Sequence, residues 1–203
     1  MTKIFLSILF FLLFTFAALA LFSCKCADCP KNDEPDIPAN VTRAGDQLIV
    51  SKTGPDFFEK YITPDFEGSK DLPGGFFMSY RMYMPERPYV DEKITFGLDS
   101  NGVLRTDIPV TGIPDCAASP ANCSFLVDES EAVKAAAEGG LPEGIKEWGK
   151  TFMWNSELNR YVWHIVSTLK GSEGPDGFRG SGVEMIIDSN SGEVLRQSEW
   201  NVR

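Results

Sequence analysis

The stretch "MIIDSNSGEVLRQ", Met185–Gln197, places a polar turn between two apolar runs, and "FGLDSNGVLRT", Phe96–Thr106, repeats the arrangement. Aspartate and asparagine side chains hydrogen-bond to the backbone of their own turn, and glycine supplies the positive φ angle of a tight hairpin. Both stretches therefore predict β-hairpins, and the repetition predicts two related sheets in one chain.

The acidic turn also raises the question of a calcium site. A loop of the EF-hand type needs oxygen ligands at positions 1, 3 and 5, glycine at position 6 and a bidentate glutamate at position 12. Counted from Asp188, Gly192 occupies position 5 and Glu193 position 6, and the flanking runs are typical of strands. This spacing excludes a calcium loop, so we predict a hairpin and no metal site.

Upstream of this hairpin, the second half of the chain predicts a helix followed by three or four antiparallel strands. In "VDESEAVKAAAEGG" (127–140), Asp128 and Glu131 have the spacing of a capping box, and two glycines end the segment. In "KTFMWNSELNRYVWHIVSTL" (150–169), two β-prone runs flank a polar turn. The segment "GSEGPDGFRGSG" (171–182) predicts a glycine-rich loop before the closing hairpin.

The first half also predicts strands. In "GGFFMSYRMYMPE" (74–86), large apolar residues occupy alternate positions, which indicates a sheet with one buried face. Ile94, Phe96 and Leu98 continue the pattern, and "VLRTDIPV" (103–110) would form the second arm of the hairpin. The methionine–aromatic stripe is interpreted as core. Upstream, Pro55 begins a segment that predicts either a short helix or an irregular stretch.

The phrases "EAVKAAAEGGL", "RYVWHIVST" and "VEMIIDSNSGEVLRQSEW" together resemble a PepSY domain over about Asp128–Trp200. Asp46–Val110 is a weaker echo, which keeps "LDSNGVL", and the glycine-rich insertion departs from the family pattern. The resemblance implies a small α+β module of the cell envelope. It further implies inhibition or regulation of peptidases, and it brings no catalytic residues with it.

The expected fold is α+β, with two tandem small units that follow an N-terminal signal. Each unit would pack a helix on an antiparallel sheet, in a PepSY- or cystatin-like arrangement. The expected segments are a signal peptide (1–23), a flexible tether (24–45), a first β-rich unit (46–115), a disulfide loop and linker (116–127) and the PepSY-like unit (128–203).

The N-terminus predicts the compartment. An uncharged apolar run, Ile4–Phe22, follows Lys3 and leads to Cys24. It resembles the lipobox of bacterial lipoproteins, in which the signal is cleaved before a cysteine that carries the lipid, such as palmitate. An uncleaved membrane-spanning anchor is the alternative. Either one tethers the remainder outside the cytoplasm, facing the periplasm or the exterior.

The other four cysteines form two closely spaced pairs. Cys116 and Cys123 predict a local disulfide in an oxidising compartment. Cys26 and Cys29 have the spacing of a redox motif but lack the strand–helix context of one, so they are interpreted as a structural or incidental pair.

Charge and motifs narrow the function classes. The formal net charge of −10 argues against partners such as nucleic acid or an anionic membrane surface. The sequence has no nucleophile elbow, phosphate-binding loop or dinucleotide fingerprint, and its only histidine, His164, lies in a predicted strand. We therefore expect neither an enzyme nor a cofactor.

The remaining prediction is a non-catalytic envelope lipoprotein that binds a protein partner, which would be a peptidase if the family resemblance applies. Trp148, Trp154 and Phe178 are candidate contacts because large aromatic residues often anchor interfaces. Core packing is the alternative for each of them. Two other functions stay open, namely an envelope hydrolase with an unrecognised acidic site and a structural spacer without a specific ligand.

Overall fold

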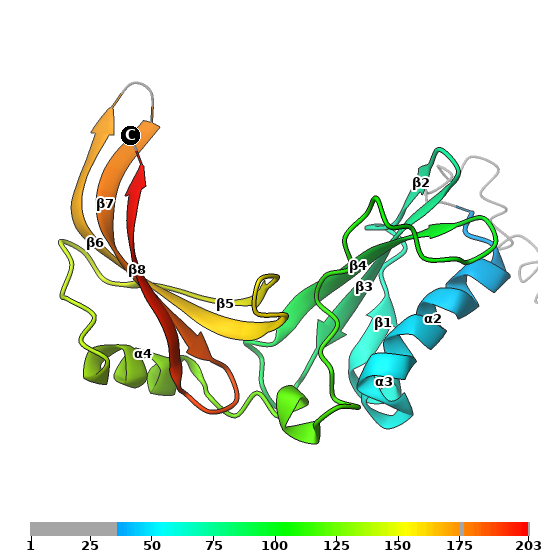
Figure 1. Cartoon of the computed structure of the whole chain (residues 1–203), viewed down its shortest axis with the longest axis horizontal. Helices are drawn as coiled ribbons and strands as arrows, with labels where there is room; N and C mark the ends of the chain where they lie inside the picture. Colours follow the sequence, from blue (N-terminus) through cyan, green and yellow to red (C-terminus); the bar gives the residue numbers. More distant parts are fainter. Residues whose placement is uncertain (1–35, 175–176, 203) are drawn as a thin grey trace, which may run out of the picture. The chain divides into compact units, whose positions relative to one another are not determined.

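The computed structural model describes residues 36–174 and 177–202 (Figure 1). Over these residues the fold is α+β, with three α-helices and two antiparallel sheets of four strands each. The elements are α2 (Ala39–Thr53), α3 (Pro55–Tyr61), β1 (Ile62–Pro64), β2 (Lys70–Leu72), β3 (Gly75–Tyr83), β4 (Asp91–Asp99), a 3₁₀ turn (Pro120–Cys123), α4 (Glu129–Glu138), β5 (Gly149–Asn155), β6 (Arg160–Gly174), β7 (Gly177–Asp188) and β8 (Val194–Val202).

The first sheet is built around β3. β4 pairs with the whole length of one edge of β3, and β1 and β2 pair in succession with the other edge. Segment 103–110 was predicted to form a strand, but in the structure it is irregular, so this prediction is wrong. Only two isolated bridges, Leu98 with Leu104 and Thr95 with Thr111, join this region to β4. Pro109 cannot donate a ladder hydrogen bond, which explains why a regular strand does not form there.

The predicted alternation along β3 is confirmed. Met78, Tyr80 and Met82 are buried, whereas Arg81 and Tyr83 are exposed. Along β4 the predicted apolar positions are buried as well. The methionine–aromatic stripe is therefore core.

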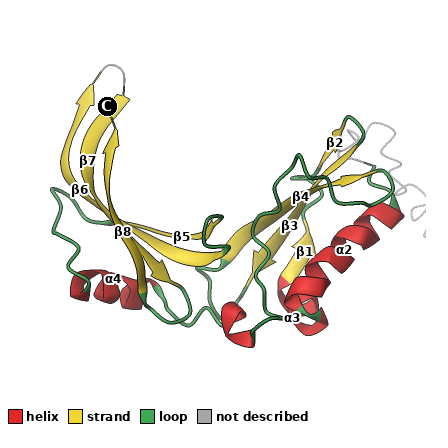
Figure 2. Ribbon diagram, in the orientation of Figure 1, coloured by secondary structure: helices red, strands yellow, loops and turns green. Residues whose placement is uncertain are grey.

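A long helix, α2, packs against this buried face, beside the short helix α3 (Figure 2). For the segment that begins at Pro55, the structure thus has the short helix and not the irregular alternative. The Tyr80 hydroxyl donates to the Asp46 carboxylate at 2.9 Å, and Gly45 lies so close that an added Cβ would be 2.6 Å from that hydroxyl. Residues 39–45 are thus helical, which corrects the flexible tether predicted over 24–45. The composition is polar, but α2 buries one narrow apolar stripe that includes Val41 and Ile49.

The second half follows the predicted order, with α4 and then four antiparallel strands in the order β5-β6-β7-β8. Asp128 and Glu131 form the predicted capping box at the start of α4. Ala132 and Ala136 are fully buried, so the small alanine face lets the helix lie close to the sheet.

The glycine-rich segment 171–182 was predicted as a loop, and this is corrected. The β6–β7 ladder continues through it, pairing Gly171 with Gly180 and Glu173 with Phe178. The Phe178 ring covers both glycines, because a Cβ added at either one would lie 2.7 Å from the ring. The absence of a side chain at Gly171 and Gly180 thus leaves room for an aromatic ring across the two strands.

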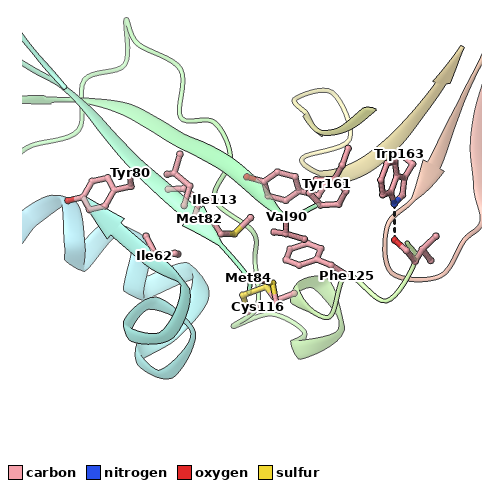
Figure 3. Packing of buried hydrophobic residues seen from close by; sticks show 14 of the residues in the cluster. Ile62, Tyr80, Met82, Met84, Val90, Ile113, Cys116, Phe125, Tyr161 and Trp163 are labelled. Atoms are coloured by element: carbon pink, nitrogen blue, oxygen red, sulfur yellow. Dashed lines mark hydrogen bonds between the residues drawn. A yellow bond between two sulfur atoms is a disulfide. The ribbon is translucent and has the colours of Figure 1, made fainter. Parts of the chain in front are cut away.

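An aromatic cluster joins the two sheets into one core (Figure 3). Tyr89 of the first half contacts the rings of Phe152 and Trp163, and Phe125 packs edge-on against Tyr161. The Trp163 indole donates to the carbonyl of Val127 at 2.8 Å. The described residues, 36–174 and 177–202, accordingly belong to a single compact unit.

Candidate partner-binding surface

The turn between β7 and β8 is stabilised by hydrogen bonds to its own aspartate, Asp188. The Asp188 carboxylate accepts hydrogen bonds from the backbone N–H groups of Asn190 and Ser191, each at 2.9 Å, and from the Arg160 guanidinium at 2.9 Å. Burial raises the pKa of Asp188, but these bonds outweigh burial, and the net pKa lies below its usual value. The Asn190 side chain in turn accepts from the backbone N–H of Phe125 at 2.8 Å.

The earlier turn is also held by its aspartate, although it is one residue shorter. Asp99 accepts from the backbone N–H groups of Asn101 and Val103, each at 2.8 Å, and Gly102 and Gly192 both have positive φ angles. Among residues 36–174 and 177–202, no three His, Cys, Asp or Glu side chains gather closely enough to hold a metal ion. In both turns the aspartate carboxylate binds backbone N–H groups of its own turn.

His164 lies on the face of the second sheet opposite α4, in a polar row that crosses three strands. Its Nε2 atom is 2.8 Å from the Glu184 carboxylate, which also accepts from the Ser198 hydroxyl at 2.9 Å. Burial alone would raise the pKa of Glu184, but these partners lower it overall. Because the carboxylate lies between the serine and the histidine, this row is no nucleophile–base pair.

The predicted disulfide between Cys116 and Cys123 is present, and both residues are buried. It closes the 3₁₀ turn just before Phe125 enters the aromatic core. Cys24, Cys26 and Cys29 lie outside the described residues, as do the predicted signal and the first part of the tether.

Trp148 borders an open groove of about 300 Å³ between α4 and the segment that leads into β5. Its indole is partly buried, and its Nε1 donates to the carbonyl of Pro142 at 3.1 Å, which fixes the orientation of the ring. The groove is lined by Val133, Glu143, Gly144, Lys146, Glu147, Trp148 and Lys150.

Phe178 lies outside the groove lining but contacts one of the lining residues, Lys146. Phe178 is 36% exposed, and the Lys146 ammonium lies 5.1 Å from the centre of its ring. Since Lys146 also lines the groove, it connects Phe178 to Trp148. We call the groove residues together with Phe178 the Lys146 surface.

Trp154, the third predicted contact, is placed elsewhere. It is partly buried, packs edge-on against Tyr161 at 5.1 Å, and is not among the residues that line the groove. The structure thus brings together two of the three predicted aromatic residues and assigns the third to core packing.

The charged part of the surface was not predicted from the sequence. Lys150 is held by Glu129 at 3.0 Å and by Glu147 at 2.7 Å, whereas Lys146 faces an aromatic ring. The segment "EGIKEWGK", 143–150, carries both lysines around one tryptophan. That clustering of cations about an aromatic residue is the signal that could have identified the surface.

A second missed residue is Glu92 on β4. It pairs with Met82 and so lies on the face of the first sheet that is otherwise apolar. Burial and the neighbouring Asp91 raise the pKa of Glu92 to about 7. Glu92 acts electrostatically on the buried Tyr161, whose pKa is raised by burial first and by Glu92 second.

Comparison with protein-family models and with curated proteins finds no match for this chain. Within the described part of the chain, no helix has the length and apolar character needed to cross a membrane. The apolar run Ile4–Phe22 lies outside that part.

Proposed function

We propose that this chain is a non-catalytic lipoprotein of the bacterial cell envelope that binds a protein partner through the Lys146 surface. The observation that carries the proposal is the joining of Trp148 and Phe178 by Lys146 around an open groove. Tryptophan is enriched among the residues that dominate binding energy in protein interfaces, and phenylalanine is enriched in interfaces relative to the rest of the surface.

The PepSY resemblance of residues 128–200 supports regulation of a peptidase as the purpose of this binding. Each half packs a helix on a four-stranded antiparallel sheet, and the turns at Asp99 and Asp188 each have an aspartate that accepts a hydrogen bond from the backbone N–H two residues later. These likenesses support a tandem origin of the two halves, although two strands of the first sheet, β1 and β2, are only three residues long.

The proposed lipid anchor and the tether that follows it are inferred from the sequence alone. Lipid attached at Cys24 would hold the protein at a membrane, and the residues between Cys24 and α2 would separate the folded unit from the lipid. The acidic composition would keep that unit off an anionic membrane surface.

The second candidate is an envelope hydrolase with an acidic site, in which Glu184, the carboxylate of the polar row with His164 and Ser198, would be the catalytic acid or base. If this row were catalytic, Glu184→Gln would abolish a hydrolytic activity of the protein. The partner-binding proposal expects Glu184→Gln to leave partner binding intact. A spacer without a ligand would tolerate changes at both sites.

The proposal is tested with the full chain in envelope membranes that are gently solubilised and captured on an antibody. Wild type is compared with Phe178→Ser and with Val103→Ser, which changes a 61% exposed residue in the first hairpin turn. We expect a partner that is retained by wild type and Val103→Ser, lost with Phe178→Ser, and whose peptidase activity changes on binding. Equal retention by all three proteins would contradict the proposal.

A further inference from the structure

The strand β8 is the last strand on one side of the second sheet, and its outer edge is open (Figure 1). It pairs with β7 along its inner edge. Apart from that ladder, no backbone hydrogen bond joins residues 194–202 to another part of the chain that the structure describes. A row of unpaired N–H and C=O groups on an edge strand is a template for the addition of another strand.

The first sheet covers the corresponding edge of its own long outer strand, β4. Thr95 and Thr111 exchange two backbone hydrogen bonds, at 3.0 and 2.9 Å, and the N–H of Arg105 donates to the carbonyl of Gly97 at 2.9 Å. The segment that follows β4 therefore lies along its edge. Among the described residues no segment does the same for β8, so the second sheet has an open edge where the first sheet has a covered one.

The side chains of β8 leave the open edge accessible. Arg196 donates to a glutamate of the β5–β6 turn at 2.6 Å, Ser198 to a glutamate of β7 at 2.9 Å, and Trp200 to a backbone carbonyl of β6 at 3.2 Å. All three partners lie on the β7 side of β8, so these side chains are directed away from the edge. Proteins often block edge strands with proline or lysine, and β8 contains neither.

We propose that β8 pairs with β8 of a second copy of this chain, antiparallel and about a two-fold axis through Ser198. Side chains that face each other in an antiparallel pair lie on the same face of the sheet, so the axis must pass through a residue and not between two residues. With Ser198 on the axis, Gln197 of each copy faces Glu199 of the other, and each carboxylate has an amide donor opposite. Arg196 likewise faces Trp200, which brings a cation to an aromatic residue.

The two neighbouring registers are less favourable. An axis at Glu199 would place its carboxylate directly opposite the same carboxylate of the other copy, and like charges in that position are destabilising. An axis at Gln197 would place Glu199 opposite the apolar Leu195, which the ladder with β7 skips. Because the chain has a formal net charge of −10, two copies repel each other unless the carboxylates at their contact are kept apart. The axis at Ser198 meets this condition.

Cysteine crosslinking in membranes tests the position of the axis. The parent is the full chain with Cys26→Ser and Cys29→Ser, in which Cys116 and Cys123 stay joined in their disulfide. Ser198→Cys is compared with Asn201→Cys, an exposed position on the same strand. In the proposed register position 198 faces itself, whereas the two copies of position 201 are offset by six residues, about 20 Å along the strand, beyond the reach of a disulfide.

We expect mild oxidation to convert Ser198→Cys into a product of twice the chain mass, about ten-fold more than Asn201→Cys or the parent gives. Equal yields at positions 198 and 201, in a Ser198→Cys protein that melts at the temperature of the parent, would overturn the inference. So would a product whose mass shows that position 198 has joined a different protein.

A mixed pair of variants keeps the hydrogen bond of Ser198 to Glu184 intact. Gln197→Cys and Glu199→Cys are placed in two copies with tags of different size and are produced together. Because position 197 of one copy faces position 199 of the other, the mixed dimer should form several-fold more than the dimer of either variant with itself. A mixed product no more abundant than the two unmixed products would overturn the proposed register and the pairing with it.

Discussion

The Tyr161 hydroxyl of β6 donates to the carbonyl oxygen of Gly112 at 2.9 Å, and this bond links the second sheet to the segment that follows β4 of the first. Only glycine fits at position 112, because the Cβ of any other residue would lie 2.4 Å from the backbone oxygen of Lys93. Tyr161 is also enclosed by the rings of Phe125 and Phe152. The two halves are therefore held by a buried aromatic core with specific hydrogen bonds.

Glu92 should make the stability of this core depend on pH. Its pKa in the folded chain is about 7, above the value of 4.5 for an isolated glutamate. The raised pKa favours the folded state when Glu92 is protonated, and this contribution is lost as pH rises through about 7. We expect Glu92→Gln to exceed wild type in free energy of unfolding by about 1–2 kcal/mol at pH 8, after allowing for partial solvent exposure, and by much less at pH 5.

Urea denaturation of the two proteins at both pH values measures this difference. Glu199→Gln on β8, which removes an exposed carboxylate, serves as the control and should change stability little at either pH. A gain for Glu92→Gln that is the same at pH 5 and pH 8 would refute the buried-charge explanation.

Gly45 should be essential for the packing of α2. Alanine at this position would place its Cβ 2.6 Å from the Tyr80 hydroxyl, so either the helix or the buried tyrosine must move. We expect Gly45→Ala to lower the free energy of unfolding by about 1–3 kcal/mol, despite the better helix propensity of alanine. Gly174→Ala is the control, because its Cβ would come no closer than 3.7 Å to another atom, and denaturation curves that coincide for both variants would exclude the steric explanation.

The disulfide between Cys116 and Cys123 should contribute about 2–3 kcal/mol by restricting the unfolded chain across a separation of seven residues. The double variant Cys116→Ser/Cys123→Ser should unfold at a lower temperature than wild type. A reducing agent should lower the melting temperature of wild type and leave that of the double variant unchanged. If the reductant shifts both proteins equally, the stabilisation has another source.

Cys24→Ala tests the anchor. We expect the variant to be released from the membrane fraction or to accumulate unprocessed, since the lipid-bearing thiol is gone. Cell fractionation and the mass of the purified protein report the two outcomes. Membrane attachment and mass that match wild type, apart from the substitution, would favour an uncleaved anchor formed by Ile4–Phe22.

Local patterns predicted much of the fold. Alternation identified β3 and β4, and the capping box at Asp128 located α4, because each signal depends on neighbours within a few residues. α2 was not predicted because its stripe of buried residues is narrow. The need for glycine at position 45 depends on Tyr80, which is distant in the sequence and packs against it in the fold. Segment 171–182 was predicted as a loop because it is rich in glycine. In the structure two of these glycines lie in paired strands and make space for the Phe178 ring.

The candidate surface was harder to predict than the fold. Trp148 and Phe178 were identified one by one as large aromatic residues, but nothing local shows that Lys146 lies between them. Trp154 has the same residue type and a similar neighbourhood in the sequence, yet it packs against Tyr161. A binding surface depends on contacts between distant segments, and the folded structure is needed to select among candidates.

The most direct test of the central claim is site-specific photo-crosslinking in the living cell envelope. A photoreactive phenylalanine analogue replaces Phe178 in the full chain, and Val103 is replaced in the control. Our account predicts one discrete crosslinked partner from position 178, absent from position 103 and abolished when Lys146→Gln is added. No crosslink from position 178, or the same products from both positions, would contradict a binding role for the Lys146 surface.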